Sequence, residues 1–235
     1  MKLVSLALLV AVGMVFNGQG FVALEPDQII RSLIYGPTGL VGSPRYWKVM
    51  FALHSGISDN EWVVSKLAAR DILAIFDAMP GPSSISLSRH RIGLVRFSTW
   101  AHVIIPLGTY IFYPANDAAI AAVPKGPGGG ANINLALELC SGQLGFYGNR
   151  LVWMTTDGYY TNGIDPRPTA SAMKQKGNII CIVVIGDDAN MAVINGMASW
   201  IRVPPFFFGK CVLRYSTYAD YRAATYAARR RLPPS

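Results

Sequence analysis

The chain has 235 residues, of which 51% are hydrophobic and 14% charged, so it can bury one substantial core but leaves little room for a second. Its formal charge of +8 favours acidic partners such as nucleic acid, anionic polysaccharide or acidic protein. No aromatic RNA-binding signature and no zinc-finger spacing accompany this charge, so nucleic acid is not an expected partner. We therefore expect one domain with short extensions.

The amino terminus has the pattern of a secretory signal peptide. Lys2 precedes an apolar run from Leu3 to Phe16, and small residues follow up to Ala23. The run is shorter than the roughly 20 apolar residues of a membrane-spanning helix, although a retained anchor or a buried helix are the alternatives. We expect a signal peptide over residues 1–23 and a mature chain that is secreted and extracellular, without a membrane span.

Residues 24–46 are rich in Pro and Gly and are expected to form an amino-terminal arm that lies against the domain. Apolar side chains between Ile29 and Ile34 are placed to cover an apolar patch there. The domain is expected to run over residues 47–231, and residues 232–235 form a short tail.

Within the domain, apolar strand-length runs alternate with segments of helical periodicity. The predicted strands are 48–53, 92–97, 101–107, 151–156, 178–185 and 211–215. The predicted helices are 62–79, 132–144, 166–176, 188–199 and one that starts at 217, with Asp59 or Asn60 as the first N-cap and Asp187 and Asp188 capping the fourth helix. The stretch after residue 107 is rich in Pro, Tyr and Ala and carries no predicted element.

This alternation predicts an α/β fold with a mostly parallel sheet that is covered on both faces. The runs 92–97 and 101–107 are joined by only a few residues, which favours a hairpin. The second of them is then an antiparallel edge strand.

Five segments of the chain, in this order, carry a resemblance to a known family. They are His54-Ser-Gly-Ile-Ser58, Arg91 to Ser98, Gly129 to Leu137, Thr155-Thr-Asp-Gly158 and Val184 to Asp188. Together they resemble a von Willebrand factor A (vWA) domain over nearly all of the mature chain. The resemblance implies a three-layer, Rossmann-like, doubly wound sheet of six strands, with polar loops gathered at one end.

The resemblance also implies a metal ion-dependent adhesion site (MIDAS), which a vWA domain builds from Asp-x-Ser-x-Ser, a Thr and a second Asp. In this chain His54 stands for the first Asp, Gly56 for the first Ser and Ala131 for the Thr, while Ser58 and Asp157 remain. Mg²⁺ prefers a cage of oxygen ligands, so the loss of three donors predicts a degenerate site without a bound metal.

Two alternatives stay open at this site. Mg²⁺ could still bind if backbone or partner oxygens replaced the lost donors, and a softer ion such as Zn²⁺ could use His54 and Asp157. We expect instead that His54 bonds to Asp157 or to a loop carbonyl. The other histidines, His90 and His102, are expected at the surface or at the sheet edge.

The chain has three cysteines, an odd number for a secreted protein. Cys181 lies inside an apolar run and is expected to be a small buried hydrophobe. Cys140 or Cys211 would then be a free thiol or would join two chains. No Gly-x-Ser-x-Gly elbow or cysteine-centred motif indicates an enzyme.

These features predict a secreted, non-enzymatic vWA-like interaction or extracellular matrix module. It is expected to bind a protein partner through Tyr159, Tyr160 and Asn162, beside the degenerate metal site. The basic face or the segment Pro205 to Phe208 could also bind, although its phenylalanines more often pack in a core. The alternatives are a metal-dependent domain that adheres to cells or collagen, and a basic structural matrix protein that binds acidic polymers.

Overall fold

The strand that leads to His54 lies in the centre of a six-stranded sheet. The computed structural model describes residues 24–36, 44–161, 163–203 and 207–232, so the predicted signal peptide and Asn162 lie outside the described residues. The strands of the main sheet are β1 (Trp47–His54), β2 (Arg91–Phe97), β3 (Ala101–Ile105), β4 (Asn149–Thr156), β5 (Asn178–Ile185) and β8 (Val212–Tyr215). Their order across the sheet is β3-β2-β1-β4-β5-β8.

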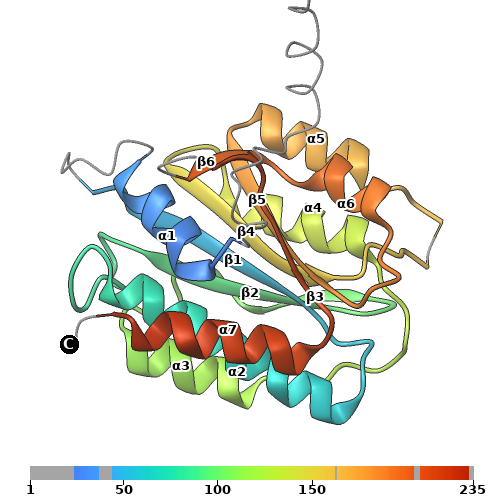
Figure 1. Ribbon diagram of the computed structural model, residues 1–235, viewed down its shortest axis with the longest axis horizontal. Coiled ribbons are helices and arrows are strands. Elements are labelled where there is room, and N and C mark those ends of the chain that lie inside the picture. Colours follow the sequence, from blue (N-terminus) through green and yellow to red (C-terminus); the bar gives the residue numbers. More distant parts are fainter. Residues whose placement is uncertain (1–23, 37–43, 162, 204–206, 233–235) are drawn as a thin grey trace, which may run out of the picture.

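All neighbouring pairs are parallel except β2 and β3, which form the predicted antiparallel hairpin at the edge. The helices are α1 (Pro26–Tyr35), α2 (Asp59–Ala78), α3 (Tyr113–Ala122), α4 (Ile133–Leu144), α5 (Arg167–Gln175), α6 (Met191–Met197) and α7 (Tyr218–Arg230). Figure 1 shows α2, α3 and α7 on one side of the sheet and α4, α5 and α6 on the other. The predicted three-layer α/β fold is confirmed.

Alternation along the central strand explains why both faces are covered. Val49, Phe51 and Leu53 of β1 are fully or almost fully buried in one core cluster, whereas Met50 and Ala52 are buried in a second cluster on the opposite face. A parallel strand that is apolar on both sides cannot face water on either side. Helices are therefore required on both faces, and the two cores follow.

The amino-terminal arm contributes α1 to the first core. Its apolar side chains Ile29, Ile30 and Ile34 are fully buried, as the sequence predicted for an arm that covers an apolar patch. The indole Nε1–H of Trp47 donates to the carbonyl of Leu33 at 3.2 Å, which ties the helix to the start of β1. The arm is thus packed against the domain.

Helix α2 begins at Asp59, and its N-cap lies one residue before the first predicted cap. The hydroxyl of Ser58 accepts the Glu61 N–H at 3.3 Å, and the Glu61 carboxylate accepts the Ser58 N–H at 2.9 Å, so the N-cap is Ser58 rather than Asp59 or Asn60. This reciprocal pair is a capping box, which a Ser with Glu three residues later can form. Further along α2, the buried Asp71 binds Arg222 and Arg229 of α7.

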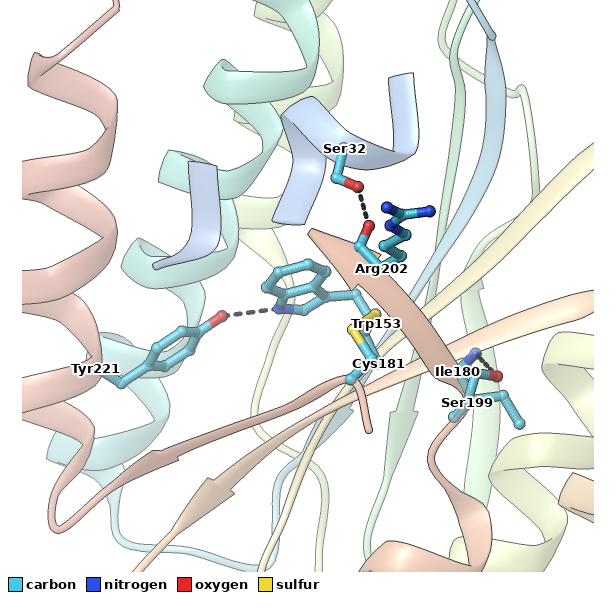
Figure 2. Close-up of a disulfide and its surroundings, with 8 residues drawn as sticks. Ser32, Trp153, Ile180, Cys181, Ser199, Arg202 and Tyr221 are labelled. Atoms are coloured by element: carbon cyan, nitrogen blue, oxygen red, sulfur yellow. Dashed lines mark hydrogen bonds between the residues drawn. A yellow bond between two sulfur atoms is a disulfide. The ribbon is translucent and has the colours of Figure 1, made fainter. Parts of the chain in front are cut away.

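The cysteine prediction was right in part, because Cys181 is buried and Cys140 is a free thiol, but Cys181 was not expected to form a disulfide. Cys181 of β5 forms a disulfide with Cys211, directly before β8, and Cys140 is a free thiol that is fully buried. β5 and β8 are parallel neighbours, which brings the two sulfur atoms together. Figure 2 shows the disulfide beside Trp153, whose Nε1–H donates to the hydroxyl of Tyr221 on α7 at 3.0 Å. A buried Cys140 cannot join two folded chains.

The histidine prediction was half wrong. His102 is exposed on the edge strand β3, as predicted, but His90 is fully buried. Its Nδ1 accepts the Trp47 N–H at 2.9 Å, and its Nε2–H donates to the Met79 carbonyl at 3.0 Å. A neutral imidazole can do both at once, since one nitrogen accepts while the other donates.

Other differences concern elements that depend on tertiary contacts. Helix α3 was not predicted, and β6 (Trp200–Val203) pairs with β7 (Phe207–Lys210) as a separate antiparallel ribbon. Phe208 is 64% exposed and stacks on Trp200, so it does not pack in the core. The hydroxyl of Ser32 in α1 donates to the Arg202 carbonyl and holds this ribbon to the arm (Figure 2).

Candidate functional site

The loops at the carboxyl ends of β1 and β4 meet beside His54. The His54 ring is 6% exposed, stacks on Phe97 with 5.2 Å between ring centroids, and donates from Nε2–H to the Gly130 carbonyl at 3.1 Å. Burial lowers the pKa of His54, while the bond to Gly130 and the charge of Asp157 act in the opposite direction. His54 is therefore a packed, hydrogen-bonded residue, and its partner is the loop carbonyl.

Gly56 and His54 depend on each other. A Cβ atom at Gly56 would lie 2.7 Å from His54 Nε2 and 2.7 Å from the Gly130 oxygen, which is closer than real Cβ contacts come. A serine at this position would collide with the imidazole and with the loop that the imidazole binds. The two departures from the vWA pattern are thus one structural change, in which the ring occupies the space that a serine side chain would need.

The loop before α4 is held by hydrogen bonds to the loop after β4. The Ala131 N–H donates to the Thr161 hydroxyl at 2.9 Å, and the Thr161 N–H donates to the Ala131 carbonyl at 3.2 Å. Asn132 then caps α4 by accepting the Leu135 N–H at 3.1 Å. The sequence analysis missed Thr161, because its link to Ala131 joins loops 30 residues apart in the chain.

The two remaining donors of the vWA pattern each bind backbone. Asp157 accepts the Tyr159 N–H at 3.0 Å, and Ser58 serves as the cap of α2. The predicted role of Asp187 and Asp188 as caps of α6 was wrong, because Asn190 accepts the Val193 N–H. Asp187 instead accepts the hydroxyl of Ser216 at 3.2 Å.

A pocket of about 240 Å³ with both polar and apolar lining opens next to His54, between the ends of β1, β4 and β5 and the start of α7. Its polar lining comes from His54, Glu61, Asp157, Ser216, Thr217 and Tyr218. The carboxylates of Glu61 and Asp157 face this space. The described residues contain no group of three or more His, Cys, Asp or Glu side chains that could hold a metal. The pocket has a negative rather than a positive lining.

This donor set does not fit a hard divalent cation. Mg²⁺ and Ca²⁺ are held by several oxygen ligands, of which carboxylates supply the charge that offsets dehydration of the ion. At the five vWA positions only Ser58 and Asp157 carry side-chain oxygen, and the His54 ring lies where a carboxylate is expected. The geometry provides a hydrogen-bonded end of the sheet with a pocket that carries two carboxylates.

The predicted partner residues flank this end in different ways. Tyr159 is 52% exposed, while Tyr160 is half-buried and packs against the core cluster that contains Ala131. Asn162 lies outside the described residues. Of the tyrosine pair, Tyr159 offers the freer aromatic surface beside Asp157.

A doubly wound six-stranded sheet with an edge hairpin, and with polar loops at the carboxyl ends of β1 and β4, defines a vWA-type α/β domain. The family model of the von Willebrand factor type A domain matches residues 55–210. The chain therefore belongs to this family. A comparison with curated proteins finds no match.

Solved structures share the fold at low identity. Two structures of proximal thread matrix protein 1 from the mussel byssus match with a TM-score of 0.64 and 16% identity, over 79% of this chain and 47% of that chain. A third structure of that protein, with a zinc-occupied MIDAS motif, matches with 15% identity and the same TM-score and coverage. The protein BatB from Bacteroides thetaiotaomicron matches with a TM-score of 0.52 and 13% identity, over 79% of this chain and 99% of that chain.

The present chain thus spans about half the length of the mussel protein. At these identities the likeness concerns the fold. Among the described helices, none combines the length and the apolar character that a membrane crossing requires.

Proposed function

We propose that this protein is a secreted, non-enzymatic vWA module of an extracellular matrix, which binds a protein partner without a metal ion. The observation that carries the proposal is the hydrogen bond from His54 to Gly130, made by a ring that Gly56 leaves room for. This contact links the β1 loop to the loop before α4 through protein atoms alone. It replaces a connection that a metal ion makes in a complete MIDAS.

Placement outside the cell is supported by the Cys181–Cys211 disulfide, since buried structural disulfides form and persist in oxidising compartments. The signal-peptide pattern of residues 1–23 agrees with it. The likeness in fold to a matrix protein of the mussel byssus supports a matrix role. We propose no catalytic role, because Nε2 of His54 is engaged by a carbonyl and not by a nucleophile.

The partner surface is proposed at the carboxyl end of the sheet, around Asp157 and Tyr159. Aromatic side chains supply large contact area at interfaces, and more than half of Tyr159 is available to a partner. Glu61 and Asp157 at the pocket attract a basic partner side chain when no metal is present. The preferred contact is thus a Lys or Arg of the partner, in contrast to the partner carboxylate that a MIDAS metal recruits.

Divalent metal ions are expected to leave the melting temperature of the wild-type protein unchanged. A ligand at 100 times its Kd would stabilise the fold by about 2.7 kcal/mol, which corresponds to a rise of several degrees in a domain of this size. The measurement is thermal unfolding in EDTA, Mg²⁺, Mn²⁺ and Zn²⁺. The matched variant is His54→Asp/Gly56→Ser/Ala131→Thr, which restores the lost donors and is expected to gain a rise with Mg²⁺.

A rise of the wild-type melting temperature in Mg²⁺ would replace this proposal with metal-dependent adhesion. A rise in Zn²⁺ alone that disappears in His54→Ala would instead establish a zinc site made with His54 and Asp157. Either outcome contradicts metal-independent binding.

Capture of a partner from extracellular matrix extract is expected to be equal with and without EDTA. Tyr159→Ser and Asp157→Asn are expected to lower the captured amount several-fold, because they remove the exposed ring and a carboxylate of the pocket. Tyr226→Ser is the control, since it removes an exposed tyrosine from α7 at a distance from this loop. Equal losses in all three variants would contradict the proposed surface, and collagen in the captured fraction would name the partner.

A further inference from the structure

A row of three cations crosses the sheet at the end opposite to His54. Arg91 of β2, Lys48 of β1 and Arg150 of β4 occupy matched positions of neighbouring parallel strands. Such strands lie about 4.8 Å apart, and matched side chains point to the same face. Like charges in adjacent positions destabilise a sheet, so this row has a cost that packing alone does not explain.

The carboxyl end of α4 offsets part of this charge. The Lys48 ammonium donates to the Leu144 carbonyl at 3.1 Å, and Nη1 of Arg150 donates to the Gly145 carbonyl at 2.9 Å. A helix end carries only about half an elementary charge, against three charges in the row. Within the described residues no carboxylate oxygen lies within 4.0 Å of Arg91, Lys48 or Arg150. The row therefore keeps an excess of positive charge.

Further basic and aromatic side chains extend the row toward solvent. The Lys176 carbonyl accepts a hydrogen bond from Arg150, and the exposed Lys176 ammonium lies 5.6 Å from the ring centroid of Phe146. Phe146 and Tyr147, in the turn between α4 and β4, are 71% and 84% exposed. We call this area the basic row surface, and its members are Lys48, Arg91, Lys176, Phe146 and Tyr147 at the surface, with the buried Arg150 contributing charge from beneath them.

We propose that the basic row surface binds a sulfated polysaccharide. A line of fixed cations matches a chain of repeated sulfate groups, and the planar guanidinium of Arg91 suits bidentate contact with such oxyanions. The exposed rings of Phe146 and Tyr147 offer flat apolar faces on which sugar rings can stack. The choice of a polysaccharide over nucleic acid rests on the proposed extracellular function, whereas the polyanion site rests on the row itself.

The test is binding of heparin oligosaccharides, measured by calorimetry in EDTA over a series of salt concentrations. Arg91→Gln/Lys176→Gln is expected to bind several-fold more weakly and to reduce the slope of log K against log salt by about two, since each lost contact removes about one. Phe146→Ser/Tyr147→Ser is expected to weaken binding while the slope stays the same. The matched control is Arg31→Gln/Arg230→Gln, which removes two exposed charges from α1 and α7.

Equal weakening in the control pair, or no binding of heparin, would overturn the proposal. Tighter binding of single-stranded DNA than of heparin at the same salt would assign the surface to nucleic acid instead. Because heparin is measured in EDTA and the metal experiment uses no polyanion, failure of this site and failure of the proposed metal-independent function give different results. Melting temperatures of all variants establish that each one is folded.

Discussion

Removal of the Cys181–Cys211 disulfide is expected to lower the free energy of unfolding by about 2–4 kcal/mol. The bond closes a segment of 30 residues, from β5 through α6 and the β6–β7 ribbon to the start of β8. Without it, the unfolded chain gains freedom that the folded chain does not. Because β8 is the edge strand that leads into α7, we expect this part of the sheet to loosen first.

Urea unfolding of the wild-type protein with and without dithiothreitol measures this contribution. The reductant is expected to lower the midpoint for the wild type and for Cys140→Ala, and to have no effect on Cys181→Ala/Cys211→Ala. The Cys140 variant controls for the loss of a buried sulfur that is not in a disulfide. A midpoint that does not respond to reductant in the wild type would contradict a stabilising disulfide.

Acid is expected to destabilise the protein through His90 by about 3 kcal/mol between pH 6.5 and pH 4. Burial lowers the pKa of His90 from 6.5 to about 4, and the nearby charge of Arg89 acts in the same direction. In this interval the unfolded chain binds a proton that the folded chain excludes, so stability falls as the pH falls. The loss is complete below about pH 4, and above pH 6.5 His90 adds no pH dependence.

The structural reason is the tautomer that the fold demands. Protonation of Nδ1 would set a second N–H against the Trp47 N–H, which now donates to that nitrogen. His90→Asn keeps an acceptor but cannot titrate, so it is expected to be less stable at neutral pH and to lose much of the acid dependence. His102→Asn, on the exposed edge strand, is the control and should keep the wild-type slope.

Urea unfolding at a series of pH values measures both variants. His54 leaves a residual slope of the same sign, because burial lowers the pKa of His54 as well. A His90→Asn variant with the full wild-type slope would show that other groups cause the acid sensitivity.

The fold was predictable because the strands are apolar on both faces, which few other arrangements accommodate. The strand over residues 178–185 has the same bounds in the structure. Helix α3 was missed because it buries only Asn116 and Ile120 and so shows no apolar stripe. Its contacts with α2 include an ion pair between Arg70 and Asp117 and a hydrogen bond from Lys66 to the Ala121 carbonyl, which periodicity cannot reveal.

The site was predictable in composition but not in geometry. The motif located His54, and a loop carbonyl was one of the two partners expected for its ring. Nothing in the sequence indicates that a side chain at position 56 and the His54 ring would compete for the same space. The cysteine pairing could not be predicted from the sequence for a related reason. It depends on β5 and β8 being neighbours, and the order of strands in a sheet is a long-range property.

The parallel sheet has one further consequence, which concerns orientation. Apart from β3, the strands point one way and place the first turns of the helices that follow them at one end, where acidic residues are favoured, and the last turns at the other. Acidic side chains lie around the pocket beside His54, among them Glu61, Asp157, Asp187 and Asp220. The row of Arg91, Lys48 and Arg150 lies at the opposite end. If the basic end of such a domain binds a polyanionic surface, its acidic end faces outward. Binding to the surface would then also set the end of the domain that a second molecule approaches.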